Sequence, residues 1–256
     1  MAPLPALIIV MGTSGCGKST VGLALAQQLA IPFVDGDDLH PAANVAKMSE
    51  GNPLTDEDRI PWLHRIREDA ILLTSHEGLS ALDTPSPGPT TSSDLTSSIS
   101  PELSVALSRI QPASLAARNE AKESGKERRR EGVVVACSAL KEQYRNLLRG
   151  EEANFVLPDG RQVEEGKHLH KQIETYFIYL QGTRELLLNR MKNRAGHFMK
   201  STMLDSQLST LEEPHETNEP RVVVVKLGQG EGEGEERGKD VVIGETVERL
   251  RGIVGE

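Results

Sequence analysis

Short runs of apolar residues alternate along this chain with longer segments in which apolar residues recur every three or four positions. The runs predict buried strands at 7–11, 32–34, 133–136, 176–180 and 221–225. The longer segments predict helices at 21–29, 41–48, 55–70, 140–148, 183–191 and 245–254, and Thr55 with Asp58 fits a capping box. Strands that alternate with helices in this way are typical of a parallel sheet covered on both faces. We therefore expect an α/β fold and one domain over residues 1–256.

Three polar stretches interrupt this alternation. Residues 76–130 form a long insertion before the strand at 133–136, and most residues of 84–101 are Ser, Thr, Pro or Gly. Such a composition buries too little apolar surface to offset the entropy of ordering, so we expect 84–101 to be disordered. Helical spacing returns at 102–117, a second insertion spans 157–173, and a Gly- and Glu-rich linker spans 228–239. We expect these low-complexity insertions to lie at the surface, outside the core.

The charge balance excludes some classes of function. With 29 basic and 38 acidic residues the net charge is −9, whereas a nucleic-acid or membrane-surface binder needs a basic face. No apolar run approaches the length of a transmembrane helix, and the N-terminus lacks the basic flank and cleavage site of a signal peptide. The two cysteines, Cys16 and Cys137, cannot form a disulfide framework. We expect a cytoplasmic protein with no nucleic-acid or membrane partner.

The first predicted strand leads directly into a phosphate-binding motif. The residues Gly12-Thr13-Ser14-Gly15-Cys16-Gly17-Lys18-Ser19, followed by Thr20, match G-x-x-x-x-G-K-[ST] between a strand and a helix. In such a loop the backbone N–H groups and the helix N-terminus cradle phosphate oxygens. Lys18 is then expected to bridge the β- and γ-phosphates of ATP, and the Ser19 hydroxyl to ligate Mg²⁺. We therefore expect a P-loop protein that uses ATP and Mg²⁺, with residues 12–20 as its nucleotide site.

Other residues indicate which kind of P-loop protein this is. The Asn-Lys-x-Asp motif of GTPases is absent from the sequence, and the strand at 133–136 ends in Cys137-Ser138 rather than in an Asp. The carboxylates instead follow the second strand, as Asp35-Gly36-Asp37, an arrangement that resembles small-molecule kinases of the shikimate-kinase type. We expect Asp35 to face the metal and Asp37 to accept a hydrogen bond or a proton from the attacking hydroxyl. The alternative is that these residues and Asp38 only form a turn and a helix cap, which we favour for Asp38.

A longer set of motifs resembles the thermoresistant gluconokinase family. The matching stretches are 35–41, 44–48, 51–59, 61–63, 137–141, 144–145, 177–180, 194–199, 203–204, 206–207 and 210–212. The resemblance implies the three-layer P-loop NTPase fold of nucleoside-monophosphate and shikimate kinases. It also implies phosphorylation of D-gluconate by ATP to 6-phospho-D-gluconate, which feeds the pentose phosphate pathway. Two alternatives stay open: a kinase for another small acceptor, such as shikimate or a nucleoside monophosphate, and a non-catalytic nucleotide-binding regulatory protein.

Gluconate carries one carboxylate and several hydroxyls, so its site needs a cation and hydrogen-bonding groups. Our first candidate for the carboxylate is Arg59, since a guanidinium binds a carboxylate through two parallel hydrogen bonds. An intrahelical pair between Arg59 and Asp56 is equally consistent with the spacing. The other basic candidates are Lys47, Lys141 and Arg145. His40 is a candidate hydroxyl ligand, with helix capping as the alternative, and Trp62 is a candidate to lie under the sugar chain, although we favour a core anchor.

Two arginines at the end of the helix at 183–191 complete the candidate site. Arg190 and Arg194 lie four residues apart before Ala195-Gly196-His197. By resemblance to nucleoside-monophosphate kinases, Arg190 would stack on adenine, and Arg194 would contact the phosphates when a lid closes. The alternative is a pair of cations that stabilises the helix C-terminus. The predicted catalytic set is then Lys18, Asp37 and Arg194; the sequence is also compatible with a homodimer and assigns no adenine contacts after the fifth strand.

Overall fold

The computed structural model describes residues 3–83, 99–125, 130–151, 155–156, 162–163, 173–193, 201–228 and 236–254. In this part of the chain the strands are β1 (Ala6–Met11), β2 (Phe33–Asp35), β3 (Gly132–Ala136), β4 (Phe155–Val156), β5 (Gln162–Val163), β6 (Glu174–Gln181) and β7 (Val222–Lys226). The helices are α1 (Lys18–Leu29), α2 (Ala42–Ser49), α3 (Asp56–Thr74), α4 (His76–Asp83), α5 (Pro101–Ser108), α6 (Pro112–Glu123), α7 (Glu142–Arg149), α8 (Arg184–Asn193), α9 (Ser201–Thr210) and α10 (Lys239–Val254), with a 3₁₀ helix at Gly36–Leu39. Residues 84–98, most of 157–173 and most of 228–239 lie outside the described residues, so the expectations for them stay predictions.

Five strands form one parallel sheet in the order β2-β3-β1-β6-β7, and β4 and β5 form a separate antiparallel pair. The chain starts in the middle of the main sheet, because β1 pairs with β3 on one side and with β6 on the other. The strand order therefore changes direction at β1. In open parallel sheets, ligands bind outside the carboxyl ends of the strands at such a switch point. The fold thus places the loop after β1 where a ligand is expected.

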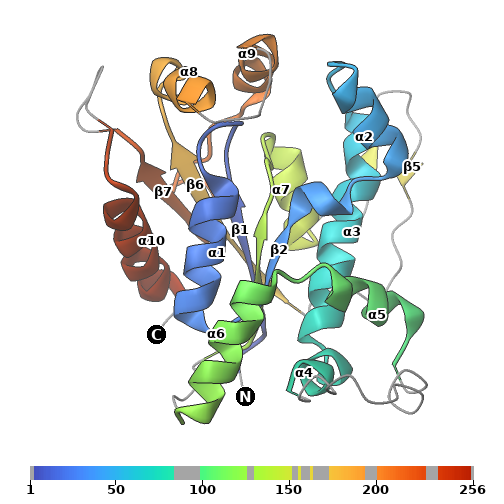
Figure 1. The fold of residues 1–256 in the computed structure, drawn as a ribbon. Coiled ribbons are helices and arrows are strands. Elements are labelled where there is room, and N and C mark those ends of the chain that lie inside the picture. The colour runs from blue at the N-terminus through green and yellow to red at the C-terminus, as the bar shows by residue number, and fades with distance from the viewer. Residues whose placement is uncertain are drawn as a thin grey trace.

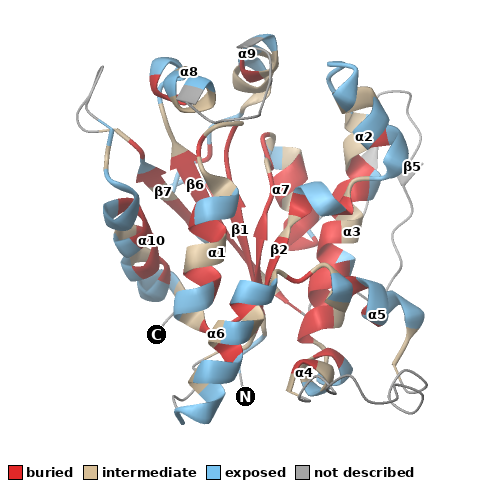
Figure 2. Cartoon of the chain, viewed as in Figure 1, coloured by how far each residue is buried: buried red, intermediate tan, exposed pale blue. Residues whose placement is uncertain are grey.

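Helices cover both faces of this sheet. Leu7 and Ile9 of β1 lie in an apolar cluster with residues of α3, α5 and α7. Ile8 and Val10 lie in a second cluster, with residues of α1, α8 and α10. The alternation follows from the two-residue period of a strand. Figure 1 shows α1 and α10 in front of the sheet, and Figure 2 shows the strands buried between the layers. The three-layer α/β fold expected from the sequence is confirmed.

Part of the predicted insertion belongs to the core. Leu103 and Ala106 of α5 are fully buried in the cluster that contains α3. At the outer edge of β2, the Gln111 N–H donates to the Phe33 carbonyl at 2.9 Å, and Ser114 Oγ accepts the Phe33 N–H at 3.0 Å. The expectation of a surface insertion is therefore corrected for residues 99–125. Burial of Leu103, Ala106 and Ile110 and the hydrogen bonds to β2 make this segment part of the folded structure, while most of its other side chains are exposed or half-buried.

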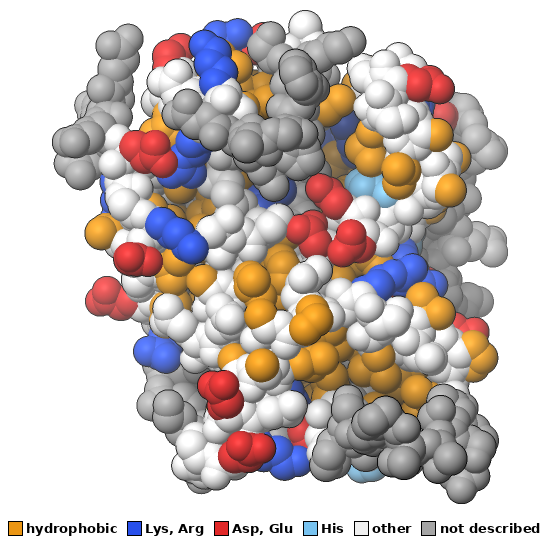
Figure 3. Space-filling model, in the orientation of Figure 1, with side chains coloured by type: hydrophobic (Ala, Val, Ile, Leu, Met, Phe, Trp, Pro, Cys, Tyr) orange, Lys and Arg blue, Asp and Glu red, His pale blue; other side chains and the backbone are white. Residues whose placement is uncertain are grey.

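The surface of the described residues is mixed in character. On the face in Figure 3, acidic and basic side chains are interspersed with small apolar areas. The large apolar side chains that are exposed, such as Val45 of α2, Val105 of α5 and Val241 of α10, belong to different elements. Single exposed apolar residues of this kind are normal on soluble domains and need no partner. Among the described helices, none is long and apolar enough to cross a membrane.

Candidate active site

The loop after β1 has the geometry of a phosphate cradle. Gly12, Gly15 and Gly17 have φ angles of 139°, 83° and 97°, which residues with a Cβ rarely adopt. At Gly12 space is also lacking, because a Cβ there would lie 2.9 Å from Cys16 Sγ. Helix α1 then begins at Lys18 with no side-chain cap and no acidic residue in its first turn. Its first N–H groups and its positive dipole end are therefore available to an anion.

The side chains of this loop divide between the nucleotide side and the core. Lys18 lies back along the loop, and its Nζ donates to the Thr13 carbonyl at 3.1 Å. Ser19 and Thr20 are exposed in the first turn of α1, where their hydroxyls can contact a bound nucleotide. Cys16 is fully buried, so it offers a ligand its backbone rather than its thiol. These positions are compatible with the roles expected from the sequence.

Helices α8 and α9 lie next to this loop. Arg190 of α8 donates from Nη1 to the Cys16 carbonyl at 2.9 Å. Gln207 of α9 accepts the Ser14 N–H at its Oε1, at 2.6 Å. The structure thus brings Arg190 to the loop, whereas Arg194 lies outside the described residues and stays a prediction. Sequence reasoning missed Gln207, and its one signal was the family-like stretch at 206–207.

The acidic pair follows β2 at the same edge of the sheet. Asp35 caps the 3₁₀ helix, since its Oδ1 accepts the Asp37 N–H at 3.2 Å, and the Asp37 side chain is exposed. Burial raises the pKa of the Cys137 thiol to about 12, and the charges of Lys18, Asp37 and Asp35 also act on that pKa. Asp35 pairs with Ala136 at the end of β3, and the Gly12 N–H donates to the Ser138 carbonyl at 3.4 Å, so the acidic turn and the phosphate loop both lie at the carboxyl end of β3. Phosphoryl transfer needs such a grouping of cation and carboxylates.

A divalent cation fits this corner together with phosphate oxygens. Among the described residues, no group of three or more His, Cys, Asp or Glu can hold a metal ion. In kinases Mg²⁺ typically takes one or two protein oxygens and completes its shell with substrate phosphates and water. The exposed Ser19 hydroxyl and the Asp35 carboxylate are hard oxygen ligands of the kind that Mg²⁺ prefers. This donor set fits the magnesium ion expected from the sequence.

His40 and Trp62 form a stacked pair next to the acidic turn. Their ring centroids are 4.1 Å apart, with 16° between the ring planes. Trp62 is only 2% exposed and donates from Nε1 to the Gly36 carbonyl at 2.7 Å. The core anchor that we favoured from the sequence is therefore what the structure shows, and the candidate place of Trp62 under the sugar chain is corrected, because the side chain holds Gly36 and the His40 ring. Burial, together with the charge of Arg59, lowers the pKa of His40 to about 4. His40 Nδ1 lies 3.5 Å from the Asn44 side-chain amide nitrogen, which leaves Nε2 of the neutral ring as the nitrogen that can bond a hydroxyl group.

A hydrogen-bond network joins the start of α3 to the start of α7. Asp56 accepts hydrogen bonds from Lys141 Nζ at 2.9 and 2.8 Å, from Gln143 at 3.2 Å and from the Tyr144 hydroxyl. Burial would raise the pKa of Asp56, but the bonds from Lys141 and Tyr144 outweigh burial and lower the pKa. The ionised Asp56 therefore compensates the charge of Lys141.

Arg59 lies beside this network and contacts Tyr144 rather than a carboxylate. Its Nη1 is 3.5 Å from the Tyr144 hydroxyl, and its Cζ is 5.9 Å from the centroid of the Tyr144 ring. Asp56, the intrahelical partner that the spacing allowed, pairs with Lys141 instead, so that alternative is wrong. In the described part of the chain, no carboxylate forms an ion pair with Arg59. Its charge is therefore available to an anionic ligand.

The remaining two basic candidates are compensated by carboxylates. Lys47 Nζ lies 2.5 Å from Asp58 Oδ2, and Asp58 also closes the predicted capping box at the start of α3. Arg145 is 1% exposed, and its Nε and Nη2 bond the two carboxylate oxygens of Glu219 at 2.7 and 2.6 Å. Its Nη1 bonds two backbone carbonyls of the β3–α7 connection. The prediction that Arg145 contacts the substrate is therefore corrected, because it fixes Glu219 against α7.

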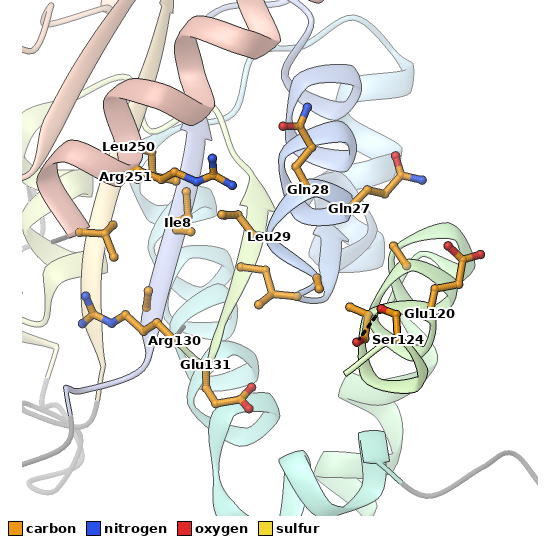
Figure 4. Close-up of a pocket in the computed structure, with 16 residues that line it drawn as sticks. Ile8, Gln27, Gln28, Leu29, Glu120, Ser124, Arg130, Glu131, Leu250 and Arg251 are labelled. Atoms are coloured by element: carbon orange, nitrogen blue, oxygen red, sulfur yellow. Dashed lines mark hydrogen bonds between the residues drawn. The ribbon is translucent and has the colours of Figure 1, made fainter. Parts of the chain in front are cut away.

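A large cavity lies away from this site. It has a volume of about 820 Å³ and is lined in part by Gln27 and Gln28 of α1, Glu120 of α6 and Arg251 of α10 (Figure 4). Ala6, at the start of β1, also lines it. The cavity therefore opens at the amino ends of the strands, at the opposite edge of the sheet from the loop after β1.

A phosphate cradle beside an acidic turn, at the carboxyl edge of a parallel sheet in which β1 is central, defines a small-molecule kinase of the P-loop class. The family model for shikimate kinase matches residues 14–59. The chain is 31% identical to a probable gluconokinase of Schizosaccharomyces pombe, over 94% of this chain and 89% of the relative. It is 34% identical to the thermosensitive gluconokinase of Escherichia coli, over 80% and 71%. The crystal structure of a gluconokinase from Sinorhizobium meliloti superposes with a TM-score of 0.55 at 32% identity, over 98% of this chain and 91% of that chain. The chain belongs to the gluconokinase family, which confirms the resemblance found in its sequence.

Proposed function

We propose that this protein transfers the γ-phosphoryl group of ATP to a hydroxyl of D-gluconate and releases ADP and 6-phospho-D-gluconate. The observation that carries the proposal is the guanidinium of Arg59, uncompensated by a described carboxylate, near the neutral His40. Both lie on the acceptor side of a P-loop. A cation and a neutral hydrogen-bonding ring suit an acceptor with one carboxylate and several hydroxyls, and the relatives named above are gluconokinases.

The phosphate side acts by positioning and electrostatics. The N–H groups of the loop and the Lys18 ammonium hold phosphate oxygens and stabilise the negative charge that moves to the leaving ADP. Ser19 and Asp35 are the residues that would hold Mg²⁺ together with the nucleotide, and the ion would supply positive charge that offsets the charge of the phosphates. Arg190 is expected to stack on adenine and Arg194 to contact the phosphates when a lid closes, which excludes water from the transfer.

The acceptor side orients the attacking hydroxyl. Asp37 accepts the hydrogen bond of that hydroxyl and takes its proton as the new bond to phosphorus forms. Arg59 binds the carboxylate of gluconate through two parallel hydrogen bonds, which fixes the far end of the chain. His40 bonds a hydroxyl between them. Lys47 and Lys141, each paired with an aspartate, stay secondary candidates.

An acceptor panel tests this proposal. The purified protein receives ATP and Mg²⁺ with D-gluconate, shikimate or a nucleoside monophosphate, and ADP release is measured. We expect turnover with D-gluconate and its loss in Lys18→Ala. Shikimate is the critical comparison, because it also carries a carboxylate and hydroxyls. A preference for either other acceptor, or ATP binding without transfer to any of them, contradicts the proposal.

A matched pair of substitutions on α3 tests whether Arg59 binds the carboxylate of gluconate. Arg59→Lys keeps the charge but loses the paired hydrogen bonds, so the KM for gluconate should rise by about tenfold or more while the KM for ATP stays unchanged. Arg65→Lys is the control, because Arg65 pairs with Asp69 on the same helix. Equal KM values for gluconate in the two variants would remove Arg59 from the proposal.

The setting of the reaction is part of the proposal as well. We place the protein in the cytoplasm, where its product would enter the pentose phosphate pathway. Cell fractionation and the growth of a deletion strain on gluconate test these two statements. A homodimer stays a prediction, which light scattering coupled to size-exclusion chromatography tests.

A further inference from the structure

Helix α9 is fixed to the nucleotide side of the candidate site. Leu204 is fully buried in the apolar cluster that also contains residues of α8. Asp205 pairs with Arg184 of α8 through two hydrogen bonds, at 2.6 and 3.0 Å. Figure 1 shows α8 and α9 side by side above the sheet. Helix α9 is therefore attached to the helix that carries Arg190.

The segment after α9 is fixed to the acceptor side. The Glu212 N–H donates to the Leu140 carbonyl at 2.9 Å, and the Glu212 carboxylate accepts the Glu142 N–H at 2.7 Å. Glu212 thus binds the start of α7, directly beside Lys141. Together, α9 and this segment form a continuous connection between the two sides of the site.

Within this connection, Gln207 contacts the phosphate loop. Its Oε1 accepts the Ser14 N–H at 2.6 Å, and this N–H is one of the donors of the cradle. The amide of Gln207 carries an acceptor oxygen and a two-proton donor nitrogen. A phosphate oxygen bound in the cradle would compete with Oε1 for the Ser14 N–H. Rotation of the amide would then turn its nitrogen, rather than its oxygen, toward that phosphate.

We propose that Gln207 is a further residue of the nucleotide site, which exchanges its bond to Ser14 for a bond to the terminal phosphate of a nucleoside triphosphate. This new bond holds α9 against the γ-phosphoryl group. Because Glu212 connects α9 to the start of α7, the bond also aligns the start of α7 with the γ-phosphoryl group. ADP has no γ-phosphate to offer Gln207 this second bond. The inference rests on the proposed phosphoryl transfer and adds a residue that distinguishes ATP from ADP.

Two substitutions at Gln207 and one control separate this role from packing. Gln207→Ala removes both the acceptor and the donor. Gln207→Glu keeps the acceptor but, when ionised, has no donor. Ser209→Ala is the control, because Ser209 is exposed on the same helix and, among the described residues, its hydroxyl bonds the Ser206 carbonyl alone. Each variant is assayed for kcat with ATP and D-gluconate, and for the Kd of ADP and of a non-hydrolysable ATP analogue by calorimetry.

We expect Gln207→Ala to lower kcat by about tenfold to a hundredfold, because a hydrogen bond to a charged group is lost. Its Kd for ADP should stay unchanged or decrease, since the competing acceptor for the Ser14 N–H is gone. Gln207→Glu should weaken binding of the ATP analogue more than binding of ADP. Its kcat relative to wild type should rise as the pH falls toward the pKa of the new carboxyl group, because the protonated acid regains a donor. Ser209→Ala should match wild type.

Two results overturn the inference. One is a wild-type kcat in Gln207→Ala, and the other is a Kd for ADP that weakens in this variant as much as kcat falls. Either result makes Gln207 a packing residue of α9. Failure of the proposed function is a separate outcome, because the affinities for ADP and the ATP analogue are measured without any acceptor.

Discussion

Replacement of Trp62 by Phe removes one hydrogen bond and part of one ring, and the structure allows both losses to be estimated. The indole N–H donates to the Gly36 carbonyl at 2.7 Å. Loss of a buried hydrogen-bond partner costs about 1–3 kcal/mol. The smaller ring leaves a cavity beside His40 and costs about 1–2 kcal/mol more. We therefore expect Trp62→Phe to lower the free energy of unfolding by about 2–5 kcal/mol, a large part of the stability of a typical domain.

The same substitution should also affect catalysis. Gly36 lies between Asp35 and Asp37, and a Cβ at Gly36 would lie 2.3 Å from the Ala136 carbonyl, so this turn is packed directly against β3. Release of its carbonyl frees the turn to shift, and we expect kcat to fall about tenfold or more, since misplacement of a reacting group by an ångström is costly. Unfolding in urea is followed by circular dichroism, because Trp62 is the only tryptophan and its fluorescence is lost in the variant.

Leu63→Ala is the control for a general loss of stability. Leu63 is fully buried on the same helix, and its truncation should cost about 2–5 kcal/mol without touching Gly36. Under conditions where both variants are folded, Leu63→Ala should keep the wild-type kcat. A wild-type kcat in Trp62→Phe would refute the view that the hydrogen bond between Trp62 and Gly36 positions the acidic turn.

The remaining predictions concern the acidic turn, a buried histidine and the insertion. Asp37→Asn should lower kcat by about a hundredfold or more while the Kd for ATP stays near wild type, and an unchanged kcat would return Asp37 to the role of a turn residue. The pKa of His40 is lowered to about 4, so between about pH 6.5 and 4 the unfolded chain binds a proton that the folded chain does not. Stability should therefore fall by about 1–3 kcal/mol as the pH drops through this window, and urea midpoints should show a smaller fall in His40→Gln. Ser114→Ala leaves the Phe33 N–H without its partner and should cost about 1–3 kcal/mol in urea unfolding, whereas the exposed Ser104→Ala should cost nothing measurable. Replacement of 84–98 by a short Gly/Ser linker should leave gluconate turnover within about a fewfold of wild type, since loop closure depends only weakly on length; loss of turnover in a folded variant would make this segment part of the site.

The apolar pattern predicted the strands of the main sheet because each of them is buried on both faces. The predicted run at 7–11 corresponds to β1 at Ala6–Met11, and the run at 133–136 to β3 at Gly132–Ala136. The apolar pattern does not predict the order of the strands in the sheet, because that order depends on where each helical connection returns the chain to the sheet. The structure also divides the predicted helix at 102–117 into α5 and α6, and Pro112 at the start of α6 was an unused signal for that break.

The candidate site was predictable where the motif itself sets the geometry and not where a distant partner does. The P-loop glycines adopt positive φ angles because the loop must turn there, and local sequence carries that information. Arg145 and Lys141 were equivalent candidates in the sequence, but Glu219, which lies 74 residues away in the chain, pairs with Arg145 and removes it from the site. In the same way, Asp56 pairs with Lys141 across 85 residues rather than with Arg59 nearby. Charge compensation of this kind is a property of the folded chain.

The segment 99–125 covers the edge of β2, and this has a consequence for how the protein behaves in concentrated solution. β2 is an edge strand, and the N–H and C=O groups of an open edge can pair with a strand of another molecule and start aggregation. Here Val34 bridges Ile110, and Phe33 bonds to the segment that follows. A chain that lacks 99–125 would present this edge to its neighbours. We therefore expect the segment to protect against self-association at high concentration, a role that leaves the chemistry of phosphoryl transfer untouched.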